Sequence, residues 1–121
     1  MLLKLDLGLE RLKINRNKFM IIYNVTVTVQ NEIVEEWLNW IRLEHIPEVL
    51  STGLFIDSVL KRVITNYNDE STFAVSYTCE SMKKLHEYEV TWSKKLQKKH
   101  ILKFGEKVAS FRTILEEIEK F

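Results

Sequence analysis

The residues of this chain that are best able to do chemistry are its three histidines, its single cysteine and a set of tyrosines and tryptophans. His45 follows Glu44, and an imidazole that titrates near neutral pH beside a carboxylate is able to act as a general acid or base. His45 is therefore the candidate catalytic residue. The alternative is a structural role, in which the ring N–H caps the end of a helix.

The other reactive groups indicate structural roles. His100 follows two lysines near the end of an expected helix, where a positive side chain stabilises the negative helix end. Cys79 has no second cysteine with which to form a disulfide within the chain, and we expect an inert, partly buried thiol. The histidines and the cysteine lack the close spacing of metal ligands, and the three glycines form no phosphate-binding loop. We expect no metal and no cofactor.

Aromatic side chains define the candidate ligand site. Those at helical spacing are Trp37, Trp40, Tyr88 and Trp92. Two tyrosines on expected strands point toward the buried side, where each hydroxyl needs a hydrogen-bond partner. The predicted ligand-binding residues are Tyr23, Trp37, Trp40, Tyr77 and Trp92. The alternative is that these aromatic side chains form only the core.

These residues lie on segments whose hydrophobic patterns change between strand and helix. The expected strands are residues 20–30, 54–65, 71–79 and 107–115. The expected helices are residues 32–44 and 81–104, with a short segment over 47–52 after a bend at His45. Ser81 is an expected N-cap, and Gly53 and Gly105 are expected helix ends. This order predicts a ferredoxin-like βαββαβ α+β fold, with a four-stranded antiparallel sheet and both main helices on one face.

The second face of such a sheet must be solvated or covered by a partner. Strand parity predicts that Tyr23 and Tyr77 lie beneath the helices and that small, polar residues lie on the open face. A face of this kind favours sheet-to-sheet pairing of two copies, as in a dimeric α+β barrel. The predicted dimer-face residues are Asn24, Thr26, Ser76 and Arg112. Which face holds Arg62 stays open. We expect Arg62 and Arg112 to meet an acidic residue of the partner copy, and the alternative is that they bind the carboxylate of a ligand.

Length and charge exclude several classes of protein. A chain of 121 residues suits one domain, and 18 basic against 17 acidic residues create no strong field for nucleic acid or anionic lipid. No apolar run is long enough for a membrane-spanning helix, so we expect a cytoplasmic protein that binds neither membrane nor nucleic acid. Residues 1–19 differ from the rest in pattern and charge. We expect them to be an upstream start or an appended arm, followed by a single domain over residues 20–121.

Several short motifs carry a family resemblance. They are MIIYNVTV at 20–27, EEWL at 35–38 with Trp40, EHIPEVL at 44–50 with Thr52-Gly53, Lys99-His100, Phe104-Gly105, and Phe111-Arg112-Thr113. Together these residues resemble a bacterial family known as domain of unknown function 4286. The resemblance covers nearly everything after Met20 and implies a small protein of the dimeric α+β barrel group, without an activity.

Two functions remain in view. The first is a non-catalytic homodimer that binds a small molecule or a protein partner. The alternative is a cofactor-independent monooxygenase or isomerase of the same group, in which His45 carries a proton. A remote third hypothesis is haem binding or degradation, for which Asn24, Tyr77 and His86 lie in similar regions to residues of haem degraders. Parity argues against it, because it places Asn24 and Tyr77 on opposite sheet faces.

Overall fold

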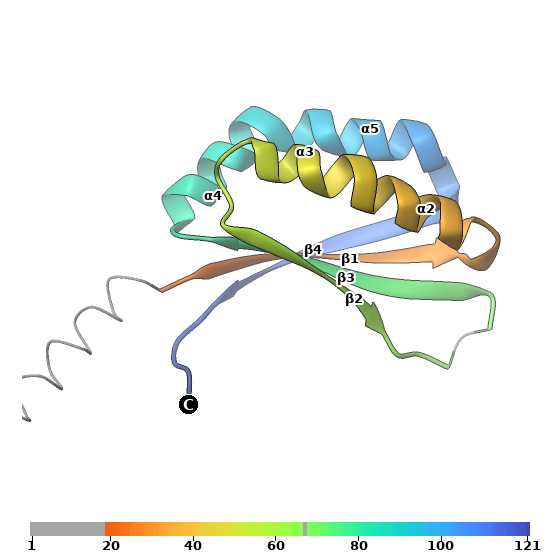
Figure 1. Cartoon of the computed structure of the whole chain (residues 1–121), viewed down its shortest axis with the longest axis horizontal. Helices are drawn as coiled ribbons and strands as arrows, with labels where there is room; N and C mark the ends of the chain where they lie inside the picture. The colour runs from red at the N-terminus through yellow and green to blue at the C-terminus, as the bar shows by residue number, and fades with distance from the viewer. Residues whose placement is uncertain (1–18, 67) are drawn as a thin grey trace, which may run out of the picture.

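The computed structural model of the chain describes residues 19–66 and 68–121 (Figure 1). Its four strands are β1 (Ile21–Gln30), β2 (Asp57–Val63), β3 (Glu70–Cys79) and β4 (Val108–Glu116). They form one antiparallel sheet in the order β2-β3-β1-β4, so β2 and β4 are the edge strands. The predicted ferredoxin-like topology is confirmed. The predicted N-terminal arm, residues 1–19, lies outside the described residues except for Phe19.

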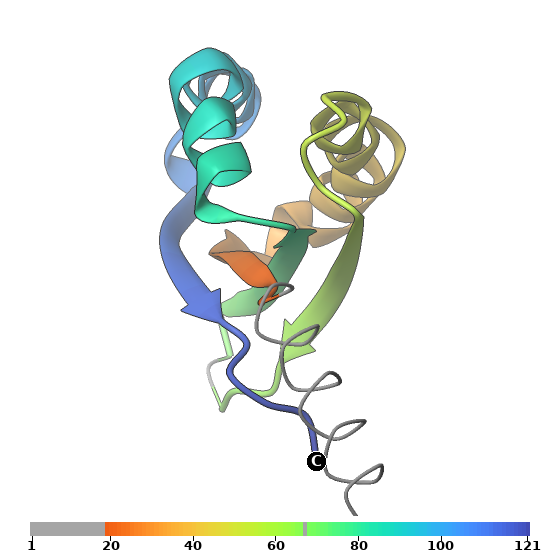
Figure 2. The same cartoon turned by 90° about the vertical axis from the view of Figure 1, so that its left-hand side faces the viewer.

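Two long helical segments cover one face of the sheet, as Figures 1 and 2 show. The first comprises the 3₁₀ turn η1 (Asn31–Ile33), α2 (Val34–Trp40), the π-helical turn η2 (Ile41–His45) and α3 (Ile46–Ser51). The second comprises α4 (Met82–Tyr88), the π-helical turn η3 (Glu89–Ser93) and α5 (Lys94–Phe104), and the 3₁₀ turn η4 (Gly105–Lys107) follows it. Each helical segment therefore contains one widened turn near its middle.

The expected bend at His45 is wrong, because the first helical segment continues through His45 to Ser51. Pro47 lies in the first turn of α3, where in a regular α-helix its ring would clash with the carbonyl four residues earlier. The wide turn η2 comes directly before this position, and the Ile46 N–H bonds to the Ile41 carbonyl five residues back. The π turn thus lets the helix pass Pro47 without breaking.

The predicted helix ends agree with the structure. The Ser81 hydroxyl accepts a hydrogen bond from the Lys84 N–H at 3.2 Å and caps α4. Gly53 (φ +76°) ends the first helical segment, and Gly105 (φ +57°) ends α5. Residues with a Cβ rarely adopt these positive φ angles, so glycine allows the chain to leave each helix and enter the next strand.

The strand register defines the two faces of the sheet. Tyr23 pairs with Tyr77 on β3 and with Ile114 on β4, and this face is buried under the helices. Asn24 pairs with Ser76, and Thr26 pairs with Ala74, on the opposite, open face. Residues opposite one another in antiparallel strands share a face.

The prediction that Arg112 lies on the open face is wrong. Arg112 pairs with the half-buried Val25, which lies on the helix-covered face, and its Nε donates to the Tyr23 hydroxyl at 2.9 Å. The register also answers the question about Arg62, which pairs with Phe73 on the same covered face. Its guanidinium carbon lies 4.9 Å from the centre of the Phe73 ring.

The open face carries apolar side chains among its small polar ones. Phe111 on β4 pairs with Thr26 and is 62% exposed, and Leu115 pairs with Ile22 on the same face. Val59 and Val63 on β2 are exposed on this face as well. The face is therefore less polar than the sequence pattern predicts.

The core lies between the sheet and the helices. Trp37 is fully buried and stacks on Phe73 at 4.9 Å between ring centres, and Val27 and Leu85 are buried beside the sheet. Burying one such large side chain contributes about 1.5–3 kcal/mol to folding. None of the helices in the described part of the chain is long and apolar enough to span a membrane.

Candidate functional site

His45 lies at the end of the π turn η2, between two hollows of the structure. We call them the outer pocket, lined by Trp40, Glu44, His45, Glu48, Lys99, Leu102 and Lys103, and the inner cavity, which lies between the helices and the sheet. The His45 ring stacks on Trp40 with 4.9 Å between ring centres. Its Nδ1 is buried and has no hydrogen-bond partner among the described residues. The protein thus holds an imidazole nitrogen in its interior without giving it a hydrogen-bond partner.

The environment of His45 keeps its ring neutral. Burial, followed by the nearby His100, lowers the pKa of His45 from 6.5 to about 4. The Glu48 carboxylate acts in the opposite direction, whereas the Arg112 and Lys99 cations add to the lowering. A neutral imidazole is able to accept a proton or a hydrogen bond. The alternative of a helix-end cap is wrong, since His45 lies inside a continuous helical segment.

His100 lies in the interior, contrary to the predicted surface role at the helix end. It is only 8% exposed, and its ring stacks on Trp40 at 5.3 Å with 10° between the planes. The Trp37 Nε1–H donates to His100 Nε2 at 2.9 Å. Burial, followed by the positive charge of Arg112, lowers the pKa of His100 to about 4.

The hydrogen bond from Trp37 determines the tautomer of His100. An indole N–H is only a donor, so His100 Nε2 must accept and cannot carry a proton. The neutral ring therefore carries its proton on Nδ1. His100 is one of the residues that line the inner cavity.

The inner cavity is small and is surrounded by aromatic hydroxyls. Its free volume is about 30 Å³, enough for one or two water molecules. Tyr23, Tyr77 and Tyr88 line it together with the two histidines and Arg112. Burial is the main cause that raises the pKa of both Tyr77 and Tyr88, so both stay as neutral phenols at pH 7.

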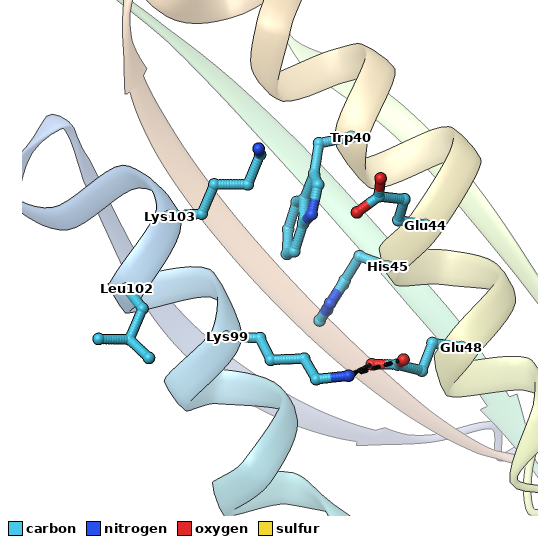
Figure 3. Close-up of a pocket in the computed structure, with 7 residues that line it drawn as sticks. All are labelled: Trp40, Glu44, His45, Glu48, Lys99, Leu102 and Lys103. Carbon is cyan, nitrogen blue, oxygen red and sulfur yellow. Dashed lines mark hydrogen bonds and ion pairs between the residues drawn. The ribbon is translucent and has the colours of Figure 1, made fainter.

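The outer pocket is larger and more open, with a volume of about 370 Å³. Figure 3 shows the His45 ring between Trp40 and an ion pair that crosses from α5 to α3. In that pair, Lys99 Nζ lies 2.8 and 2.9 Å from the two carboxylate oxygens of Glu48. The pocket thus has a flat aromatic wall on one side and charged groups at its mouth.

The predicted ligand-binding residues separate into four groups. Tyr23 and Tyr77 line the inner cavity, and Trp40 lines the outer pocket. Trp37 contacts the inner cavity only through its hydrogen bond to His100. Trp92 is 36% exposed and lines neither hollow, because η3 contains one residue more than a regular turn and Ser93 takes the buried position.

Several residues of the site were not predicted from the sequence. They are Glu48, Gln97, Lys99 and His100, whereas Arg112 was predicted for the dimer face, with binding of a ligand's carboxylate as the alternative. A signal for His100 exists in retrospect, since it follows the buried Leu96 by four residues.

The residues of the haem hypothesis do not come together. His86 is exposed on α4, and Asn24 lies on the open sheet face, opposite to the buried Tyr77. The three side chains therefore face different spaces.

Comparisons with solved structures agree with the fold. A dimeric ferredoxin-like protein from an uncultured marine organism superposes with a TM-score of 0.67 at 8% identity, over 86% of this chain and 100% of the other. A protein of the ethyl tert-butyl ether D (EthD) family from Bacillus halodurans gives a TM-score of 0.62 at 16% identity, over 81% of this chain and 99% of the other. A candidate antibiotic biosynthesis monooxygenase from Bacillus cereus gives 0.55 at 16% identity, over 85% and 99%. At such identities these likenesses show the fold alone.

Sequence comparison identifies the family. No curated protein matches the chain. Residues 20–118, which contain both hollows and the whole sheet, match the family described as domain of unknown function DUF4286. The chain therefore belongs to the DUF4286 family.

Proposed function

We propose that this protein is a homodimeric, cytoplasmic small-molecule-binding protein whose ligand occupies the outer pocket and extends a polar end toward the inner cavity. The observation that carries the proposal is the position of His45, which lines both hollows and leaves a buried nitrogen unpartnered. A buried polar atom without a partner costs free energy, and a ligand that bonds to it recovers that cost.

The dimensions and the lining of the site fit a compact ligand. The outer pocket, at about 370 Å³, lies within the usual range of small-molecule sites. Trp40 supplies a flat apolar wall, and Glu48 with Lys99 supplies polar groups at the mouth. The inner cavity takes only a group of the size of one or two waters, so the bulk of the ligand stays outside it.

The homodimer is supported by the open sheet face and by the dimeric ferredoxin-like neighbour. Asn24, Thr26 and Ser76 lie on that face with the exposed Phe111 and Leu115. An exposed apolar patch rimmed by polar side chains is typical of a surface that binds a partner. Phe111→Asp is expected to convert a dimer into a monomer in sedimentation analysis, and a wild-type monomer at micromolar concentration would contradict the dimer.

Native mass spectrometry of protein taken directly from its host tests the binding function. The expected result is a retained small molecule that leaves the protein on activation in the gas phase. Trp40→Leu, which removes the aromatic wall, is expected to reduce the occupied fraction at least tenfold. Trp92→Leu is the matched control, because this tryptophan lies outside both hollows. Equal losses in the two variants, or wild-type protein free of any small molecule, would contradict the proposal.

The unpartnered His45 nitrogen also favours a second candidate function, that of a cofactor-independent monooxygenase or isomerase. In this function the neutral imidazole takes a proton from carbon or oxygen of the bound molecule, and Tyr23 or Tyr77 orients that molecule. Incubation in D₂O would then place deuterium in a retained ligand with wild-type protein but not with His45→Gln. Binding of the ligand without deuterium exchange or turnover would contradict the catalytic function and support the non-catalytic one.

A further inference from the structure

Arg112 is the charged residue that enters the inner cavity from the sheet side. It lies on the edge strand β4, is exposed, and lines the cavity together with the tyrosines and histidines. Its Nε is used by the Tyr23 hydroxyl at 2.9 Å, which fixes the side chain and leaves the Nη nitrogens for other acceptors. None of the ion pairs formed among the described residues includes Arg112.

The other groups around the cavity do not balance this charge. Tyr77 and Tyr88 are neutral phenols because burial raises the pKa of each. His45 and His100 are neutral because burial lowers the pKa of each to about 4. Among the charged groups of the outer pocket, Glu48 is held through both oxygens by Lys99, and the charges of Glu44 and Lys103 are opposite in sign. The site therefore presents one net positive charge and several hydrogen-bond donors.

Two features of the site limit the kind of anion that it is able to bind. The two Nη nitrogens of an arginine match the two oxygens of a carboxylate and form a bidentate pair. A dianion such as sulfate would bring a second negative charge that Arg112, the one cation among the described residues that line the inner cavity, does not balance, at a desolvation cost beside the buried aromatic side chains. The rings of Trp40 and His45, which stack on each other with 24° between their planes, form an aromatic wall of the outer pocket against which a planar body is able to pack.

We propose that the ligand is a small planar monocarboxylate, with its carboxylate on the Arg112 Nη nitrogens at the inner cavity and its planar body against Trp40 and His45. This inference rests on the proposed binding function and names the ligand class of the same site. In this arrangement Tyr23 is a positioning residue, since its hydroxyl holds Arg112 through Nε.

Calorimetric titration of the whole protein with benzoate and with its neutral isostere benzamide tests the ligand class at pH 7. We expect wild-type protein to bind benzoate at least tenfold more tightly than benzamide. Arg112→Gln should remove this difference in affinity. Arg112→Lys should keep part of it, because lysine keeps the positive charge but lacks the two Nη nitrogens that bind a carboxylate in a bidentate way. Arg62→Gln is the matched control, an arginine of the same sheet face on the other edge strand.

The possible results separate this inference from the function on which it rests. Benzamide bound as tightly as benzoate, or equal losses in Arg112→Gln and Arg62→Gln, overturns the carboxylate assignment and leaves small-molecule binding intact. Sulfate, a dianion at pH 7, that competes with benzoate at equal concentration overturns the preference of the site for a monoanion. Failure of both aromatic probes also overturns the assignment, whereas a retained molecule in native mass spectrometry still supports the binding function. Circular dichroism of each variant checks that it is folded.

Discussion

Acid should destabilise this protein well before its exposed carboxylates are protonated. The folded state holds His45 and His100 in neutral form, with each pKa lowered from 6.5 to about 4. Between these two values the unfolded chain binds protons that the folded protein does not bind. Stability therefore rises with pH through this window, and it falls as the pH decreases from 6.5 toward 4.

The size of the effect follows from the two pKa values. For one histidine, linkage removes about 2 kcal/mol of unfolding free energy at pH 5 relative to pH 8, and about 3 kcal/mol at pH 4. The two histidines together remove about 4 kcal/mol at pH 5. Domains of this size are commonly stable by about 5–15 kcal/mol, so the loss brings the protein close to unfolding.

Urea unfolding followed by tryptophan fluorescence, at fixed protein concentration and ionic strength, measures the loss from pH 8 to pH 5. The double variant His45→Gln/His100→Gln should unfold with a much weaker pH dependence over this range. His86→Gln is the control, since His86 is exposed on α4 and its replacement should leave the pH dependence unchanged. An unfolding free energy of the wild type that stays within about 1 kcal/mol between the two pH values would refute the reasoning.

Two further substitutions and one titration have defined expected outcomes. Trp37→Phe should destabilise the fold by about 2–4 kcal/mol in urea titration, because it leaves His100 Nε2 buried without its donor and removes buried ring area. In an ultraviolet titration of the four tyrosines, Tyr77 and Tyr88 should ionise only as the protein unfolds, and stability should fall above pH 10, since burial raises the pKa of both in the folded state. Glu48→Gln should change the unfolding free energy by less than about 1 kcal/mol, because the ion pair with Lys99 is nearly half exposed, and a larger loss would show a structural role for the pair.

The fold was largely predictable because its signals are local. Alternation of period two marks β1 and β3, whose covered sides are buried, and Ser81, Gly53 and Gly105 mark helix ends through backbone chemistry. Such signals do not depend on distant parts of the chain. The pairing of Tyr23 with Tyr77 then follows from the topology and from the burial of one face.

Arg112 was assigned to the wrong face because β4 carries no clear alternation. Almost all of its residues are exposed, and apolar side chains occur on both faces, with Ile114 on the covered side and Phe111 and Leu115 on the open side. An edge strand of this kind has a register that is specified by pairing with its neighbour, not by its own pattern. The surface position predicted for His100 is wrong for a different reason. Its lysine neighbours indicate an exposed segment, whereas its burial depends on the direction in which this position of the helix points.

The two π turns determine which residues of each helical segment point toward the sheet. They therefore determine which side chains reach the site. Trp40 and His45 are five residues apart and stack at 4.9 Å, yet in a regular α-helix residues at this separation point about 140° apart. The wide turn η2 brings them onto one side and directs His45 toward the space between the hollows. In the second helical segment, η3 places Tyr88 and Ser93 on the buried side in the same way and turns Trp92 outward. π turns are uncommon and are frequently found at functional sites. The two π turns that make the regular helical periodicity mispredict side-chain directions are therefore also the features that position the residues of the site.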